Sequence, residues 1–275
     1  MSGSRFEGLE PGELDTAAYT QGERGAHAGL VSRLISLVSD ERASYLGLDS
    51  AALHIRSLLE KHPISNANAF LDEIVLELAA CAPASENFSH SHHLLDPLVQ
   101  ALYDRGHDHL VLDITPLQKP PLMLADFLHG TPERKLTLTI IGDLYCVAQQ
   151  AHNCAITCTG TISGVAASHA VTSEFIFGKS VSSAGPNAYR CTFDLQSWNA
   201  LPPAFDYTSS GPKDRYWTFP TECVYHISDE FSRPALEYYR LKGFFIAGNV
   251  VHHLTPDGVW HEERGEEPVE MVRPT

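Results

Sequence analysis

Residues 136–195 read LTLTIIGDLYCVAQQAHNCAITCTGTISGVAASHAVTSEFIFGKSVSSAGPNAYRCTFDL, and this stretch decides the fold. Within it, Gly142, Gly160 and Gly178 are separated by eighteen residues twice. Each copy opens with a short run typical of a β-strand (LTLTII, AITCT, EFIF), turns at its glycine and then carries small residues. A fixed period of this kind predicts repeated structural units.

Superposing the copies at this period aligns residues of like character. The aligned sets are Leu138 with Ile156; Ile140 with Cys158 and Ile176; Leu144 with Ile162; Val147 with Val165 and Ser183; and Ala148 with Ala166 and Ala184. A unit of about eighteen residues cannot bury its own apolar face, so we expect the units to stack as a solenoid with like residues turned inward. Glu174 departs from this pattern, because it falls in the column of Leu138 and Ile156. The alternative is three ordinary antiparallel strands whose alignment is fortuitous.

The copies resemble the single-stranded right-handed β-helix that forms the C-terminal domain of the glutamate synthase large subunit and recurs in a related component of formylmethanofuran dehydrogenase. More loosely, they resemble the iron–sulfur assembly scaffold β-helix. The resemblance covers residues 136–195 and is degenerate, since the glycine-rich G-x-x-G-x-x-x-G coils of that family are reduced here to Gly142, Gly160, Gly164, Gly178 and Gly185. It implies a short right-handed parallel β-helix with a structural role and with no catalytic residue.

The chain before this stretch has helical periodicity. Apolar residues recur at helical spacing over about 29–46, 49–62 and 66–80. A fourth helix is predicted with Asp96 as its N-cap, Pro97 as its first residue and Gly106 as its terminator. The alternating segment 109–114 predicts a strand.

The predicted fold class is therefore α+β, an N-terminal helical region followed by a short right-handed parallel β-helix of about eighteen-residue coils with a C-terminal hairpin cap. The hairpin is expected because Thr255-Pro256-Asp257-Gly258 separates two apolar runs, and it would close the open end of the solenoid. The predicted parts are a flexible acidic tail (1–27), the helical region (28–106), the β-helix with its lead-in strand (107–200), an aromatic- and proline-rich insert with a helix (201–243), and the capping hairpin with an acidic tail (244–275).

Charge and composition restrict the partners. The chain has 19 Lys and Arg against 34 Asp and Glu, a net charge of −15, which argues against binding nucleic acid through its phosphates or an anionic membrane surface. The N-terminus shows no secretory signal and no apolar run is long enough to span a bilayer, so a cytoplasmic location is predicted. The six cysteines include no C-x-x-C and are expected to be free, mostly buried thiols. At the eighteen-residue period Cys154 aligns with Thr172 and Arg190, not with Cys191, and Cys158 joins an inward apolar column.

Histidines form the one chemically suggestive set. His90, His92, His107 and His109 make two His-x-His pairs on either side of the predicted fourth helix, which could fold the pairs toward each other around a divalent metal. Exposed histidines without a role, at helix–loop junctions, are the alternative. On the predicted hairpin, His253 and His261 would face each other.

Aromatic residues of the insert are the best candidates for recognition: they either pack over the solenoid flank or act as interface anchors, and they are Trp198, Tyr207, Tyr216 and Trp217. The nucleophile-elbow, zincin, P-loop and dinucleotide-binding motifs do not occur. The sequence therefore favours a non-enzymatic structural or protein-interaction module, without a cofactor, that associates with itself or with a protein partner. The alternative is a metal-binding protein or metal-dependent enzyme using the histidine cluster. A pH-responsive assembly protein, suggested by the fifteen histidines, is a third possibility.

Overall fold

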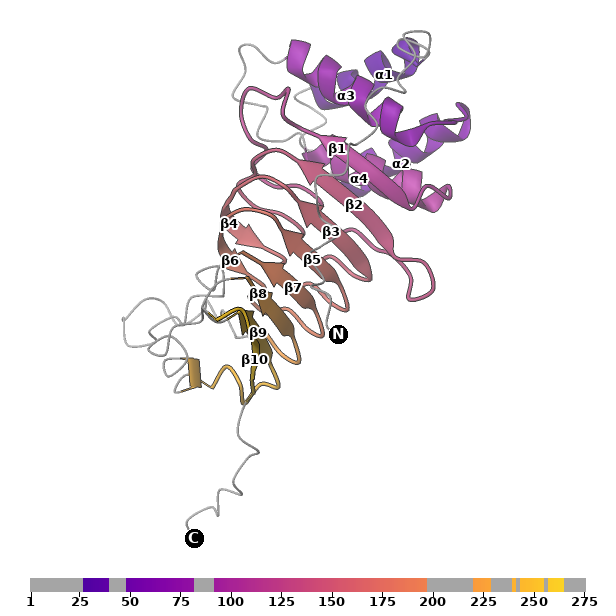
Figure 1. Ribbon diagram of the computed structural model, residues 1–275. Helices are drawn as coiled ribbons and strands as arrows, with labels where there is room; N and C mark the ends of the chain where they lie inside the picture. The colour runs from indigo at the N-terminus through magenta and orange to yellow at the C-terminus, as the bar shows by residue number, and fades with distance from the viewer. Residues whose placement is uncertain are drawn as a thin grey trace, which may run out of the picture.

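The computed structural model describes residues 27–39, 48–81, 92–196, 220–228, 239–240, 243–254 and 257–264. Within these residues the fold is α+β, with four helices at one end of a mostly parallel sheet of eight strands (Figure 1). None of the helices in this part of the chain is both long enough and apolar enough to cross a bilayer.

The four predicted helices are confirmed, as α1 (Ala28–Ser39), α2 (Leu48–Glu60), α3 (Ala67–Cys81) and α4 (His92–Asp104). Their boundaries differ from the prediction most clearly in α4, which begins at His92 and contains Pro97. The predicted N-cap role of Asp96 is therefore wrong. Leu94 and Leu95 are fully buried together with Leu98, so burial extends the helix upstream of the proline despite the lost backbone donor.

The main sheet runs in the order β1-β2-β3-β5-β7-β8-β9-β10. Its strands are β1 (His109–Asp113), β2 (Leu136–Ile141), β3 (Cys154–Cys158), β5 (Glu174–Phe177), β7 (Thr192–Leu195), β8 (Val224–Ile227), β9 (Val250–Leu254) and β10 (Trp260–Glu263). Neighbours are parallel throughout, except that β10 is antiparallel to β9. The antiparallel alternative for the repeated stretch is thus wrong. The terminal antiparallel pairing is confirmed, with His253 opposite His261.

A pass, meaning the chain from one strand of the main sheet to the next, spans eighteen residues from β2 to β3 and from β5 to β7. From β3 to β5 it spans nineteen, because Ala155 lies opposite Glu174. The extra residue corrects four predicted columns. Cys158 faces Phe177 and not Ile176, and Glu174 leaves the column of Leu138 and Ile156 and is exposed. Val147 faces Ala166 and not Val165, so Ala148 does not share the column of Ala166 and Ala184.

The extra residue is accommodated as a β-bulge. A second parallel sheet pairs β4 (Ile162–Ala166) with β6 (Val181–Ala184), and its register shifts between Ile162 and Val165. Gly164 lies in this shift, where a Cβ would come within 2.6 Å of the Tyr145 carbonyl oxygen. Glycine is therefore required for the close approach of the bulge to the preceding pass.

A third set of parallel contacts runs beside the two sheets. Isolated bridges connect His129 to His152, His152 to Val171, Val171 to Tyr189 and Tyr189 to Thr221. The same passes of the chain thus form three parallel ladders: the main sheet, the β4–β6 sheet and this row of isolated bridges.

The inward sides of the strands form a continuous core. Burial alternates along β2, β3, β5 and β7, and Cys158 is fully buried, as predicted. The rings of Phe175, Phe193 and Tyr225 stack on successive strands with centroids 5.2 and 4.7 Å apart. Phe244 continues the row, 5.6 Å from Tyr225. Stacked aromatic residues of this kind contribute through both burial and ring geometry.

The two ends of the main sheet differ. At the β1 end, helix α3 packs on the strand, and the Asn68 side chain accepts a hydrogen bond from Val111 N at 2.9 Å. At the other end the sheet order finishes with β10. One end is therefore covered by the helical region, whereas the other ends in an antiparallel strand (Figure 1).

Candidate functional site

Helix α4 carries polar side chains that bind the backbone of the chain leading into β2. Asp96, Gln100 and Tyr103 are spaced i, i+4 and i+7, so they share one helical face. Asp96 accepts hydrogen bonds from Ala125 N at 2.6 Å and from Asp126 N at 3.1 Å. These bonds explain why Asp96 is buried at a position within the helix and does not cap its N-terminus.

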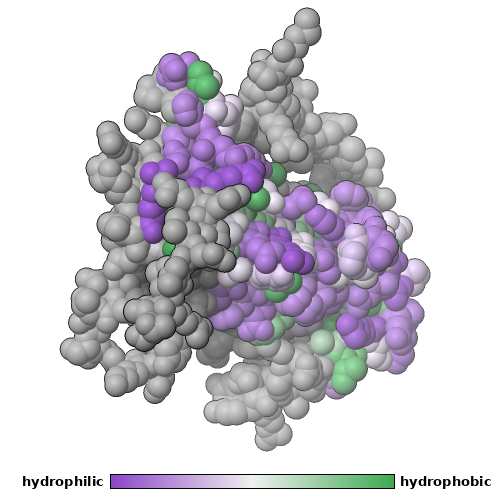
Figure 2. All heavy atoms as spheres, turned by 90° about the horizontal axis from the view of Figure 1, so that it is seen from below, coloured by the Kyte–Doolittle hydropathy of each residue, from purple (hydrophilic) through white to green (hydrophobic). Residues whose placement is uncertain are grey.

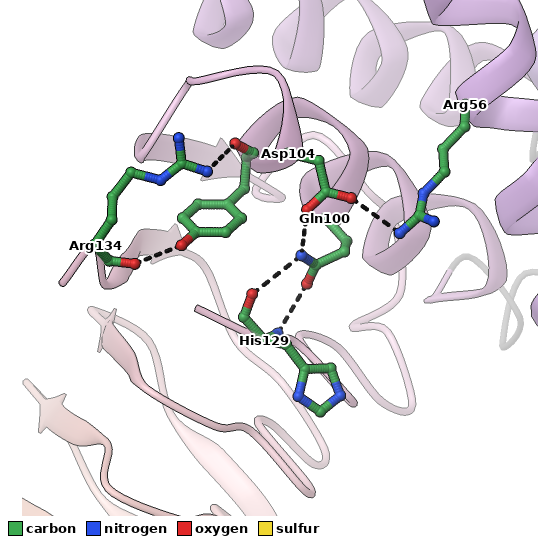
Figure 3. A network of polar contacts seen from close by, with 6 residues as sticks. Arg56, Gln100, Asp104, His129 and Arg134 are labelled. Carbon is green, nitrogen blue, oxygen red and sulfur yellow. Dashed lines mark hydrogen bonds and ion pairs between the residues drawn. The ribbon is translucent and has the colours of Figure 1, made fainter. Parts of the chain in front are cut away.

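The same face continues toward the end of α4. Gln100 accepts from His129 N at 2.8 Å and donates to the His129 carbonyl at 3.1 Å, closing a two-bond clamp (Figure 3). Tyr103 donates to the Arg134 carbonyl, and the Arg134 guanidinium donates to the Tyr103 carbonyl at 2.8 Å. We call Asp96, Gln100 and Tyr103 the α4 clamp, because they join the helical region to the first pass of the strands.

The ion pair beside the clamp is peripheral. Asp104 binds Arg56 of α2 at 2.9 Å and also accepts from Gln100 (Figure 3). The Arg56 and Asp104 side chains are 51% and 41% exposed, so their attraction is screened and contributes little to stability.

Two buried carboxylates meet at the clamp. Asp126 is 4% exposed; its Oδ1 accepts from Gln149 N at 2.9 Å, and its Oδ2 has no hydrogen-bond partner in the part of the chain that the structure describes. Burial raises the pKa of Asp126 to about 6. Burial, and secondarily the charge of Asp126, raises the pKa of Asp96 well above its usual range. Burial at this place therefore disfavours the charged form of both carboxyl groups.

A second polar feature lies at a corner that is repeated in successive passes. Asn153, Thr172, Arg190 and Glu222 all have left-handed φ angles between 49° and 55°, and Gly248 has φ 80°. The residue after each of them forms what we call the corner column, which comprises Cys154, Ser173, Cys191, Cys223 and Asn249.

Side chains of the corner column bind the backbone of the neighbouring pass. Cys154 N donates to Ser173 Oγ at 3.1 Å, Cys191 N to Cys223 Sγ at 3.3 Å, and Cys223 N to Asn249 Oδ1 at 3.0 Å. Cys154 and Cys191 therefore share a column, which corrects their predicted separation; the nineteen-residue pass is the reason. Sequence inspection at the correct spacing reveals the signal, because AQQAHNC, ASHAVTS and GPNAYRC carry a small residue at the first and fourth positions and Cys or Ser at the seventh.

The terminal hairpin collects histidines and glutamates. His252 Nε2 lies 3.1 Å from Glu262 Oε2 on one face, and on the other His253 Nε2 lies 3.7 Å from Glu263 Oε1. The His253 and His261 rings lie 6.0 Å apart, confirming the predicted juxtaposition, and His226 is edge-on to His252 at 4.9 Å. The two His–Glu pairs and the contact of His253 with His261 connect β9 to β10.

The predicted histidine cluster lies only partly within the described residues. His92 begins α4, His107 comes shortly after the last residue of the helix, Asp104, and His109 begins β1, so the rise of the helix, about 18 Å, separates the backbone of His92 from that of the other two. His90 lies outside the described residues. Among the described residues, no group of three or more His, Cys, Asp or Glu side chains is placed to hold a metal ion.

The predicted recognition residues are Trp198, Tyr207, Tyr216 and Trp217, and all four lie outside the described residues. The α4 clamp and the corner column, by contrast, were missed as sites by sequence reasoning. Asp96 and Asp126 are thirty residues apart, and no local pattern connects them.

Comparisons with protein families, with curated proteins and with solved structures find no match to this chain. Its function must therefore be argued from its own geometry.

Proposed function

We propose that this chain is a non-enzymatic structural or protein-interaction module, built on a short right-handed parallel β-helix and working in the cytoplasm as part of a larger assembly. The three parallel ladders that share one set of passes carry this proposal. A chain that completes one coil per pass produces three such ladders, and right-handed crossovers between parallel strands are the general rule.

The use of the polar side chains also supports a structural role. Asp96, Gln100, Ser173 and Asn249 bind backbone groups of neighbouring segments. Asn249 additionally donates to the carbonyl oxygens of Pro220 and Phe244 at 2.7 and 2.8 Å. Side chains used in this way hold coils together, because each satisfies backbone groups that the turns would otherwise leave without partners.

The two ends of the stack suggest where assembly occurs. Helix α3 covers the β1 end, whereas β10 is the last strand of the sheet at the other. Seen from the β10 end, the described surface is largely hydrophilic, with apolar residues scattered over it (Figure 2). Association at this end would therefore depend on edge pairing and on a few apolar side chains such as Trp260, which is 42% exposed.

Sedimentation velocity of the full chain over a concentration series tests the proposal. We expect a discrete complex that Trp260→Lys weakens and Leu53→Lys leaves unchanged, since Leu53 is 66% exposed on α2, in the helical region. Size fractionation of cell lysate provides the second arm, in which a complex with another protein should show the same pattern. A wild-type chain that is monomeric in both experiments would contradict the proposal.

A further inference from the structure

The corner column brings two thiols together across β7 and β8. Thr192 lies opposite Val224, so the preceding residues, Cys191 and Cys223, occupy directly opposite positions on parallel neighbours. Such neighbours lie about 4.8 Å apart, within the Cα separation of roughly 4.4–6.8 Å that a disulfide spans. Cys191 N donates to Cys223 Sγ at 3.3 Å, which places that sulfur against Cys191.

The other cysteines lack this relation. Ser173 separates Cys154 from Cys191 in the column, so these two are two strand spacings apart, about 10 Å, which exceeds the reach of a disulfide. Cys158 lies between Ile140 and Phe177 on its neighbouring strands. The fold therefore selects one pair.

The two thiols are chemically unequal. Cys191 Sγ donates to the Tyr189 carbonyl and Cys223 Sγ to the Thr221 carbonyl, both at 3.4 Å. The neighbouring Cys223 thiol lowers the pKa of Cys191 against the opposing effect of burial. The neighbouring Cys191 thiol, together with burial, raises the pKa of Cys223. Of the two, Cys191 is the better thiolate and Cys223 is the thiol placed to resolve it. Both side chains are buried, Cys191 being 1% and Cys223 0% exposed, so an oxidant has to be small to reach them.

We propose that Cys191 and Cys223 form a reversible disulfide when the protein meets a hydroperoxide. The Cys191 thiolate attacks the peroxide oxygen; the O–O bond breaks, Cys191 becomes a sulfenic acid, and the other peroxide oxygen takes up the proton that the Cys191 thiol had released and leaves as water or an alcohol. The sulfur of Cys223 then attacks Cys191, the S–S bond forms, and the sulfenic oxygen leaves as water with the Cys223 proton. The two thiols together lose two electrons, which reduce the hydroperoxide.

The disulfide would close the longest interval between paired strands. From β7 to β8 the register advances by thirty-two residues, against eighteen from β5 to β7. A covalent bond at this corner would tie both ends of that interval to the stack. The same interval of the sequence contains the predicted aromatic residues.

Treatment of the full chain with hydrogen peroxide, followed by alkylation and tryptic mapping, tests the inference. We expect the peptide of residues 191–213 to be linked to that of residues 216–240 and to be released by a thiol reductant. Cys191→Ser and Cys223→Ser should each abolish the link, and Cys154→Ser, in the same column, should retain it. Serine already occupies this column at Ser173, so the substitutions suit the site.

A second measurement distinguishes the nucleophilic role of Cys191 from the resolving role of Cys223. In Cys223→Ser, a sulfenic-acid probe should label Cys191, since no resolving thiol remains. Absence of the linked peptide from native oxidised protein, or its appearance only after denaturation, would overturn the inference. Neither result bears on the assembly state, so a failure here is distinct from a failure of the proposed function.

Discussion

Replacing Asp126 with asparagine is expected to stabilise the protein at neutral pH. The Asp126 side chain is buried at the α4 clamp, where Oδ1 accepts from Gln149 N and Oδ2 has no partner among the described residues. Asparagine preserves the acceptor, has nearly the same shape and removes the charge. It also removes the repulsion that Asp126 exerts on the Asp96 carboxylate.

The size of the effect follows from the pKa of Asp126, which burial raises from 3.8 to about 6. Between these values the folded protein binds more protons than the unfolded chain, so its stability falls as the pH rises through this window and the full penalty applies above pH 6. The difference corresponds to about 3 kcal/mol. Asp126→Asn should therefore raise the free energy of unfolding by up to about 3 kcal/mol above pH 6, and by little near pH 3.8, where the wild-type carboxyl is protonated in the folded state.

Urea denaturation above pH 6 and near pH 3.8 measures the change in the free energy of unfolding under both conditions. Asp143→Asn is the matched control, because Asp143 is exposed and its Oδ1 also accepts a backbone hydrogen bond, from Thr161 N at 2.8 Å. It shows what loss of one negative charge does to this acidic chain. If Asp126→Asn is no more stable than wild type above pH 6, or if the two variants change the pH dependence equally, burial of this carboxylate is not the cause.

Three other experiments, with substitutions or duplications, test the packing of the passes. Gly160→Ala should be strongly destabilising, because a Cβ there would lie 1.9 Å from a backbone carbonyl oxygen. Gly178→Ala is the control and should be nearly neutral, since the nearest atom to its Cβ would be 3.6 Å away. Equal midpoints of urea denaturation for the two variants would contradict the packing. Phe193→Ala should lower the free energy of unfolding by about 3–5 kcal/mol, since the ring is fully buried between two aromatic neighbours, and thermal unfolding that barely changes would refute this. Duplicating residues 155–173 inserts one complete pass and should retain cooperative unfolding by circular dichroism, whereas duplicating residues 155–163 alone should abolish it. Similar behaviour of the two duplications would show that the passes are not repeating units.

The periodicity of the repeats could be predicted from the sequence to within one residue. Glycines at a constant spacing indicated eighteen residues, and the pairing of Leu138 with Ile156 confirms that value for one step. The next step contains a bulge in β4, so Gly178 aligns beside Thr159 and not with Gly160. A single inserted residue leaves the local alternation of each strand intact, and it is therefore visible only when the strands are paired.

The sites were less predictable than the fold, because they depend on contacts between distant residues. Asp96 has the sequence context of a helix cap, but buried leucines upstream carry the helix past it and leave its carboxylate for the backbone of another segment. Cys191 and Cys223 are separated by the interval between β7 and β8, which has no repeat of its own. Their adjacency follows from the register alone.

The number of residues in each pass indicates where the length of this chain can vary. The register advances by eighteen or nineteen residues from β2 to β7, then by thirty-two from β7 to β8 and by twenty-six from β8 to β9. The interior nevertheless continues without a break, since Tyr225 stacks on Phe193 and Cys223 accepts from Cys191 N. The described strands therefore pair in continuous register across both of the longer intervals. Because the core is continuous across both intervals, we expect changes in their length to be tolerated better than insertions within the regular passes.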